Sequence, residues 1–205
     1  MKKVIVVGYS GHAFVAIDIM RSVGTSILGY TEPEEKAENP FDLPYLGSES
    51  SPEVIDQLKL HEFFVAIGDN QLRRRLTDRL EGEAGKRCIS ISHSSAVVSE
   101  HANLSSGVMV GANASINPMA EIGIGVICNT GSIVEHHCKV GDYAHIAPGA
   151  VLCGGVEVGR GTLIGANSVV RPMIRIGSNA VIGAGAVIVR DIADHEVTFG
   201  NQQRS

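Results

Sequence analysis

The sequence has few aromatic residues, which make up 4% of its 205 positions and include no tryptophan. They are unevenly placed, and none lies between Val65 and Asp142. A long segment without aromatic side chains must build its core from small and aliphatic ones, as the narrow interior of a β-helix does. The change in composition therefore predicts a domain boundary.

Cysteines are also few. The four thiols, at Cys88, Cys128, Cys138 and Cys153, contain no C-x-x-C pair. This spacing favours buried, reduced thiols of a cytoplasmic protein over disulfides or a metal site.

Positive charge is not in excess, because 17 Lys and Arg residues face 22 Asp and Glu residues, for a net charge of −5. This balance argues against nucleic acid or an anionic membrane as the main partner. No apolar run reaches the roughly 18 residues that span a bilayer. The short apolar run after Lys3 is also too short for the core of a signal peptide. We therefore expect a cytoplasmic protein without membrane insertion.

From Val98 to Ile188, an apolar residue returns at every sixth position. Fifteen of these sixteen residues are Val, Leu or Ile, and the exception is a cysteine: Val98, Leu104, Val110, Ile116, Ile122, Cys128, Val134, Val140, Ile146, Leu152, Val158, Ile164, Val170, Ile176, Ile182 and Ile188. A period of six fits neither a simple strand nor a helix. It is typical of a solenoid in which each hexad forms one side and one corner of a triangular coil, so we predict roughly five coils of parallel β-helix.

The first 85 residues predict a small α/β domain. Strands are expected at residues 4–7, 27–30 and 63–67, with a helix after the first strand, a connection after the second and a helix after the third. In such a βαβ sheet, ligands bind at the carboxyl ends of the strands. We thus divide the chain into a Rossmann-like βαβ domain (1–85), an all-β parallel β-helix (86–190) and a polar tail (191–205).

The helix after the third strand is expected to begin at Asp69 or Asn70, which suit an N-cap. Its apolar face is predicted to consist of Leu72, Leu76 and Leu80. Four arginines, most of which we expect on a solvated face, lie between these leucines: Arg73, Arg74, Arg75 and Arg79.

The loop from Gly8 to Ala13 joins the first strand to its helix. It lacks a complete G-x-G-x-x-G motif, because Ser10 and Ala13 occupy the second and third glycine positions. Free N–H groups at a helix N-terminus favour an anion, so the loop is either a phosphate-binding turn or a purely structural one.

Histidines interrupt the regular hexads at His136, His137 and His145. The solenoid interior is filled by aliphatic residues, so these side chains are expected on corners and exposed sides. Histidine acts as a general base near neutral pH. Their clustering indicates a functional site.

Three segments, Gly8-Tyr9-Ser10-Gly11-His12, Ala66-Ile67-Gly68-Asp69-Asn70 and Asn129-Thr130-Gly131-Ser132-Ile133-Val134-Glu135-His136, resemble the bacterial nucleotide-sugar acyltransferases. That family includes UDP-4-amino-sugar and GDP-perosamine N-acetyltransferases and sialic acid O-acetyltransferases. The resemblance implies a left-handed β-helix, a homotrimer, acetyl-CoA as co-substrate without a metal, and an N-terminal domain that holds a nucleotide sugar, with a UDP-amino sugar expected.

The resemblance also implies roles for individual residues. His136 matches the catalytic base, and Gly154 lies in the turn whose backbone N–H is thought to stabilise the oxyanion. Other matching positions are those around acetyl-CoA (His145, Ala166 and Ala184) and those around the nucleotide sugar (Ser10, Gly11, His12, Glu32 and Gly68).

Three positions depart from the family pattern. His137 replaces the acidic residue that usually follows the catalytic histidine, so either His137 itself or a carboxylate such as Glu135 or Asp142 would orient His136. Glu32-Pro33 replaces a pair of acidic residues, and Gly200-Asn201-Gln202-Gln203 replaces Gly-Asn-Pro-Ala.

The expected function is acetyl transfer from acetyl-CoA to the amino group of a nucleotide-linked sugar. Three alternatives stay open. The acceptor could be a hydroxyl, as in sialic acid O-acetylation, or the chain could be a non-catalytic nucleotide-sugar-binding scaffold. The third is a metal enzyme like the γ-carbonic anhydrases, with His101, His136 and His137 as candidate ligands.

Overall fold

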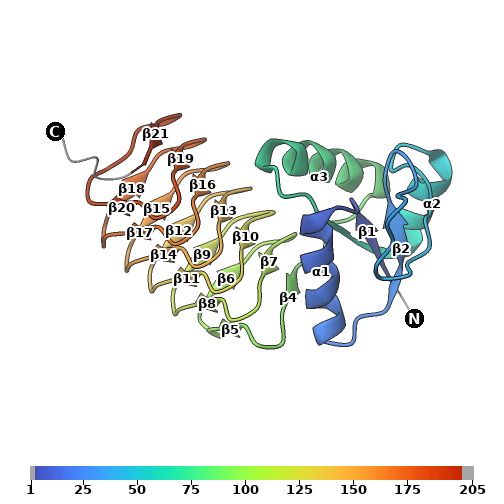
Figure 1. The fold of residues 1–205 in the computed structure, drawn as a ribbon, viewed down its shortest axis with the longest axis horizontal. Helices are drawn as coiled ribbons and strands as arrows, with labels where there is room; N and C mark the ends of the chain where they lie inside the picture. The colour runs from blue at the N-terminus through green and yellow to red at the C-terminus, as the bar shows by residue number, and fades with distance from the viewer. Residues whose placement is uncertain (1–2, 200–205) are drawn as a thin grey trace.

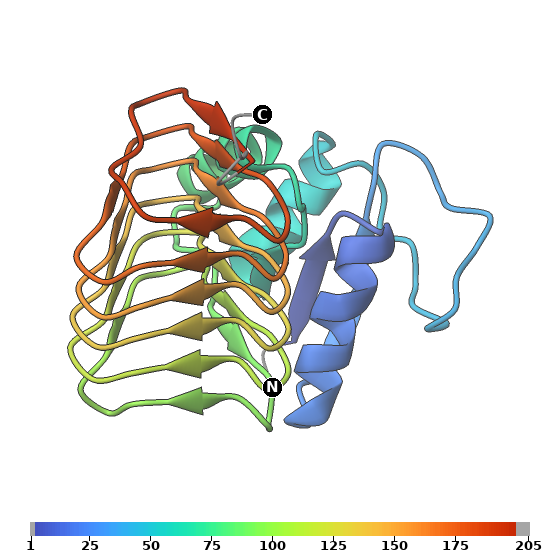
Figure 2. The same ribbon diagram turned by 60° about the vertical axis from the view of Figure 1, so that its left-hand side comes forward.

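A computed structural model describes residues 3–199. Figure 1 shows a small α/β region at one end of a long solenoid, whose last coil lies far from that region. Seen from a second direction, the coils stack in layers with the α/β region on one side (Figure 2). The predicted fold class is confirmed.

The α/β region contains a three-stranded parallel sheet in the order β2-β1-β3. Its elements are β1 (Val4–Val7), α1 (Gly11–Ser22), β2 (Ile27–Thr31), α2 (Pro52–Leu60), β3 (Glu62–Val65) and α3 (Asn70–Ala84). The strands are short and almost entirely buried, as their runs of apolar residues predict.

Helix α2 was not predicted, because we expected only a connection between the second and third strands. Its start has a recognisable signal. The Ser51 side chain accepts a hydrogen bond from the Val54 N–H, and Pro52 occupies the first turn. Val54 and Leu58 are buried on one face of the helix.

Helix α3 begins as predicted, with the Asp69 carboxylate accepting a hydrogen bond from the Leu72 N–H at 2.7 Å. The predicted apolar face is wrong at its first position, because Leu72 is 37% exposed. Arg73 is buried instead, with 2% exposure. The cause is that α3 packs against the solenoid as well as against its own sheet.

The solenoid has three parallel sheets of seven, six and five strands, which make about six turns. Sheet B contains β4 (Ile91–Ser92), β7 (Met109–Val110), β10 (Ile127–Cys128), β13 (His145–Ile146), β16 (Leu163–Ile164), β19 (Val181–Ile182) and β21 (Val197–Thr198). Sheet C contains β5 (Val97–Val98), β8 (Ser115–Ile116), β11 (Ile133–Val134), β14 (Val151–Leu152), β17 (Val169–Val170) and β20 (Val187–Ile188). Sheet D contains β6 (Asn103–Leu104), β9 (Glu121–Ile122), β12 (Lys139–Val140), β15 (Glu157–Val158) and β18 (Arg175–Ile176).

The six-residue period is confirmed by the strand register. Cys128 pairs with Ile146 in the next coil, eighteen residues or three hexads later. The solenoid also extends beyond the predicted ladder at both ends. At the start, Ser92 occupies the position where an aliphatic residue was required, and at the end β21 joins sheet B.

The interior of the solenoid is a continuous cluster of aliphatic ladder residues and small residues such as Ala114, Ala144 and Ala180. All four cysteines are free thiols, as predicted. Burial raises the pKa of Cys128 to about 12, so this thiol is uncharged and acts as a small apolar residue.

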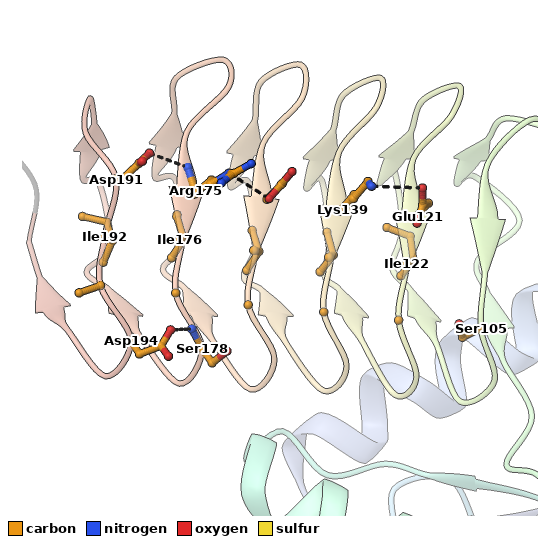
Figure 3. A pocket seen from close by; sticks show the side chains of 18 of the residues that line it. Ser105, Glu121, Ile122, Lys139, Arg175, Ile176, Ser178, Asp191, Ile192 and Asp194 are labelled. Carbon is orange, nitrogen blue, oxygen red and sulfur yellow. Dashed lines mark hydrogen bonds and ion pairs between the residues drawn. The ribbon is translucent and has the colours of Figure 1, made fainter.

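The outward faces of the three sheets differ. On sheet B, Met109 and Ile127 belong to the hydrophobic core of the α/β region, which covers the first coils of this side. Sheet D presents charges that pair along the solenoid, with Lys139 at 3.9 Å from Glu121 and Arg175 at 3.2 Å from Glu157 (Figure 3). Sheet C presents mainly valine and isoleucine.

Within residues 3–199, no helix is both long and apolar enough to cross a bilayer.

Candidate active site

His136 and His137 lie on the corner that joins sheet C to sheet D, directly after β11. Both side chains are exposed, and their rings meet edge to face with centroids 5.3 Å apart. Their Nδ1 atoms are 3.1 Å apart, which is a hydrogen-bond distance. Because one of two hydrogen-bonded ring nitrogens must donate, one of these Nδ1 atoms carries a hydrogen.

Gly154 occupies the equivalent corner position one coil above His136. A Cβ atom on Gly154 would lie 2.6 Å from Cε1 and 2.7 Å from Nε2 of His136, so only glycine leaves room for the imidazole. The neighbouring Gly155 N–H donates to the His136 carbonyl at 2.9 Å. In the described part of the chain, the Gly154 N–H itself has no hydrogen-bond partner. An imidazole beside a free backbone N–H is suited to acyl transfer.

Two exposed methionines lie above and below this corner. Met119 and Met173 hold left-handed backbone conformations, with φ of 64° and 63°, and are 55% and 76% exposed. A Cβ atom on Gly155 would come within 2.5 Å of the Met173 sulfur, so that side chain covers the glycine turn. The same left-handed conformation recurs at other corners of the solenoid, for example at Asn113, Asn167 and Asn179, so it belongs to the coil geometry. The two methionines were not singled out from the sequence, although a Pro-Met pair recurs at both corners.

Neither of the carboxylates suggested as partners for His136 makes a hydrogen bond or an ion pair with it in residues 3–199. Asp142 lies on a different corner, between sheets D and B, where its Oδ1 accepts a hydrogen bond from the Ile124 N–H at 2.8 Å. The hypothesis that Asp142 orients His136 is therefore wrong. His137 is the side chain that contacts the His136 ring.

A second group of residues lies where the α/β region meets the solenoid. Asn129 accepts a hydrogen bond from the Thr130 N–H at 2.8 Å, which directs its NH₂ group towards His145 Nε2 at 3.1 Å. His145 therefore accepts at Nε2 and carries its hydrogen on Nδ1. Its ring centroid is 6.1 Å from that of His12 on α1.

Arg73 is buried in this interface and joins the two parts of the chain. Its guanidinium donates to the carbonyls of Ile67 and Gly68 on its own side, both at 3.0 Å. Across the interface it donates to the carbonyls of Gly125, at 2.8 Å, and Tyr143, at 2.9 Å. The expectation of a solvated face is wrong for this arginine, because its guanidinium group donates hydrogen bonds to buried backbone carbonyls.

Burial is the main cause that lowers the pKa values of His12 and His145 to about 4, and the Arg73 charge lowers both further. In the unfolded chain both are near 6.5. Between these values the unfolded state binds more protons, so we expect the free energy of unfolding to fall as pH decreases from about 6.5 to 4.

Urea unfolding at several pH values measures this effect. The variant His12→Gln should lose less stability over the same pH range than the wild type, because it has one fewer histidine to protonate on unfolding. Identical pH dependence in both proteins would contradict the expectation.

The residues expected around the nucleotide sugar meet at the carboxyl edge of the β2-β1-β3 sheet. Ser10, Gly11 and His12 follow β1, Glu32 follows β2, and Gly68 follows β3. Glu32 accepts a hydrogen bond from the Tyr9 N–H at 2.6 Å. Ser10 caps α1 without a side-chain hydrogen bond. This is compatible both with a phosphate-binding turn and with a purely structural turn.

Ala166 and Ala184 lie on the corner between sheets B and C, after β16 and β19. His136 lies on the corner between sheets C and D. Within one chain, the width of sheet C therefore separates Ala166 and Ala184 from the expected base, and His145 lies on sheet B. The structure does not bring these residues together in a single chain.

Among residues 3–199, no group of three or more His, Cys, Asp or Glu side chains is arranged to hold a metal ion. His101 is exposed and lies 3.7 Å from the Glu100 carboxylate. The Gly200-Asn201-Gln202-Gln203 segment lies outside the described residues.

Comparisons with known proteins match both parts of the chain. Residues 3–80 match the PglD N-terminal domain, and residues 155–190 match the bacterial transferase hexapeptide (six repeats). A histidine-to-asparagine mutant of perosamine N-acetyltransferase from Caulobacter crescentus, in complex with CoA and GDP-perosamine, is 34% identical with a TM-score of 0.90, over 96% of this chain and 93% of that one.

The acetyltransferase domain of PglB from Neisseria gonorrhoeae, in complex with acetyl coenzyme A, is 30% identical with a TM-score of 0.89, over 96% of this chain and 95% of that one. WeeI from Acinetobacter baumannii is 21% identical with a TM-score of 0.85, over 98% of each chain, and shares the fold.

Proposed function

Since this chain belongs to the bacterial nucleotide-sugar acyltransferases and is an acetyl-CoA-dependent acetyltransferase, we propose that it acetylates the amino group of a nucleotide-linked amino sugar. The observation that carries the proposal is 34% identity, across almost the whole chain, to an enzyme in complex with CoA and GDP-perosamine. Residues 1–85 would hold the nucleotide sugar, and the solenoid would carry out the transfer.

The proposed reaction is a direct transfer with His136 as general base. His136 Nε2 takes a proton from the amine as its nitrogen attacks the thioester carbonyl of acetyl-CoA. The Gly154 N–H donates to the oxyanion that forms on that carbonyl. When the intermediate collapses, the C–S bond breaks, and the CoA sulfur receives the proton from His136.

The contact between the two histidines supports a specific placement of their protons. For His136 to accept a proton at Nε2, its Nδ1 must carry the hydrogen and donate it to His137 Nδ1, 3.1 Å away. This hydrogen bond persists once His136 is protonated, because both ring nitrogens then donate. His137 would thus hold the ring as a hydrogen-bond acceptor, the role that the family resemblance gives to an acidic residue.

We propose that the active enzyme is a homotrimer in which sheet C forms the contact between chains. The α/β region covers the first coils of sheet B, and sheet D carries paired charges. The outward residues of sheet C are almost all aliphatic: Val97, Ser115, Ile133, Val151, Val169 and Val187. Val97 is 67% exposed and Val187 is 46% exposed in the single chain. Such a stripe favours an interface.

The trimer would also complete the site. Sheet C separates the His136 corner from the corner with Ala166 and Ala184. When sheet C packs against another copy, one chain's His136 corner approaches the other chain's Ala166 and Ala184 corner. Acetyl-CoA would then lie between two subunits.

Replacing Val151 with aspartate is expected to break the trimer into monomers, because three buried carboxylates would lack partners. The same substitution at Lys139 on sheet D is the control and should leave the assembly intact. Light scattering after size-exclusion chromatography measures the mass. A trimeric Val151→Asp protein would exclude sheet C as the interface.

The acceptor is tested by measuring thiol release from acetyl-CoA with three acceptors: GDP-perosamine, a UDP-4-amino sugar and free sialic acid. We expect turnover with an amino sugar and an amide product in the mass spectrum. Turnover with sialic acid alone would contradict the proposal and indicate a sugar O-acetyltransferase. Binding of nucleotide sugars without turnover would indicate a scaffold.

A further inference from the structure

A cavity lies on the opposite side of the solenoid from sheet C. It has a volume of about 550 Å³ and is bounded by α3 and by the corner that joins sheet D to sheet B. Four arginines line it: Arg74, Arg75, Arg87 and Arg160. None of the residues in the proposed reaction lines this cavity.

The carboxylates that line the cavity already have partners. Asp78 accepts a hydrogen bond from the Tyr143 hydroxyl at 2.8 Å and lies 3.6 Å from Arg74. Asp142 accepts from the Ile124 N–H. The positive charge of the cavity is therefore only partly balanced by its own acidic residues.

Two of the four arginines have no acidic partner in the described chain. Arg87 pairs with Glu81 at 2.7 Å, and Arg74 pairs with Asp78. Arg75 on α3 and Arg160 on the solenoid form no ion pair within residues 3–199. By contrast, Arg175 on sheet D pairs with Glu157. The unpaired charges thus face one cavity from its two walls.

The rest of the lining suits a ligand that has both a charged and an apolar part. The amide side chains of Asn70, Gln71 and Asn179 add hydrogen-bonding groups around the arginines. Ile124 is partly exposed, and it lines the cavity together with Tyr143. A cavity of this volume holds a small organic molecule.

We propose that this cavity binds a small phosphate-bearing molecule of about nucleotide size, with its phosphates between Arg75 and Arg160. Guanidinium groups bind phosphate oxygens through paired, charge-assisted hydrogen bonds, which makes arginine the preferred residue for this ligand class. Because Arg75 belongs to the α/β region and Arg160 to the solenoid, the ligand would bridge the two parts of the chain.

Calorimetric titration with inorganic pyrophosphate tests the phosphate-binding part of this site. The double variant Arg75→Gln/Arg160→Gln is expected to bind pyrophosphate about ten- to a hundredfold more weakly than the wild type, since two charged hydrogen-bond donors are lost. The control is Lys139→Gln/Arg175→Gln, which removes the same charge from sheet D and should keep wild-type affinity.

Unchanged affinity in the cavity variant, or an equal loss in the sheet D control, would overturn the proposal. Both outcomes are independent of acetyl transfer, so they are separate from any failure of the proposed function. Circular dichroism shows whether each variant is folded, and the single variant Arg160→Gln replaces the double one if that does not fold. Binding to phosphatidic acid vesicles without binding to pyrophosphate would also overturn the small-molecule assignment.

Discussion

The variant His136→Ala is expected to lose acetyl transfer by about 10²- to 10⁴-fold, the usual contribution of a general base. His136 is exposed at a corner, so the fold should be unaffected. Thiol release from acetyl-CoA, with the amino sugar as acceptor, measures the rate. Unchanged turnover would remove His136 from the mechanism.

Variants of His137 test how the base is oriented. His137→Ala removes the acceptor for the His136 Nδ1–H and should reduce turnover by about tenfold. His137→Glu supplies a carboxylate acceptor at the same place. It should retain activity and shift the pH–rate profile upward, because a nearby negative charge raises the pKa of the base. Equal rates for His137→Ala and the wild type would show that His137 has no positioning role.

The variant Arg73→Ala is expected to reduce the free energy of unfolding by about 3 to 5 kcal/mol, one of the largest effects a single substitution can have. It leaves buried carbonyls without donors on both sides of the interface, including those of Gly68, Gly125 and Tyr143. Arg73→Lys should recover little, because an ammonium group cannot reproduce the planar fork.

Chemical denaturation measures this loss, and Arg74→Ala is the matched control. Arg74 lies next to Arg73 on α3 but is exposed, with a single ion pair at 3.6 Å, so its loss should cost less than about 1 kcal/mol. If Arg73→Ala were as stable as Arg74→Ala, the guanidinium would not be what joins the α/β region to the solenoid.

Most of the fold could be predicted from the sequence, because a six-residue period has few physical solutions. The ends of the solenoid could not. At Ser92 the coil is completed by pairing with Val110, so the backbone register continues where the aliphatic signal stops. Helix α2 was missed for a different reason, because its Ser-Pro start is short and two buried residues define its face.

Individual residues of the candidate site could be predicted from the sequence, but the contacts between them could not. The family resemblance indicated His136 and Gly154, and the structure places these residues one above the other, eighteen residues apart. The sequence could not show that His137 is the side chain that meets His136, because the contact depends on how two exposed rings are oriented. It also could not separate Arg73 from its neighbours on α3, because burial there depends on the packing of two distant parts of the chain.

The carbonyls that hold α3 come from a repeating backbone. Gly125, Tyr143 and Gly161 follow one another at intervals of one coil, and Arg73 and Asn70 bind their oxygens. The same row of carbonyl acceptors would be present if the α/β region lay one coil further along the solenoid. These hydrogen bonds therefore hold the two parts together without fixing which coil α3 contacts. Side chains that occur in only one coil must fix the position of the α/β region. The Tyr143 hydroxyl, which donates a hydrogen bond to Asp78, is one of them. The height of the α/β region along the solenoid therefore depends on a few non-repeating side chains.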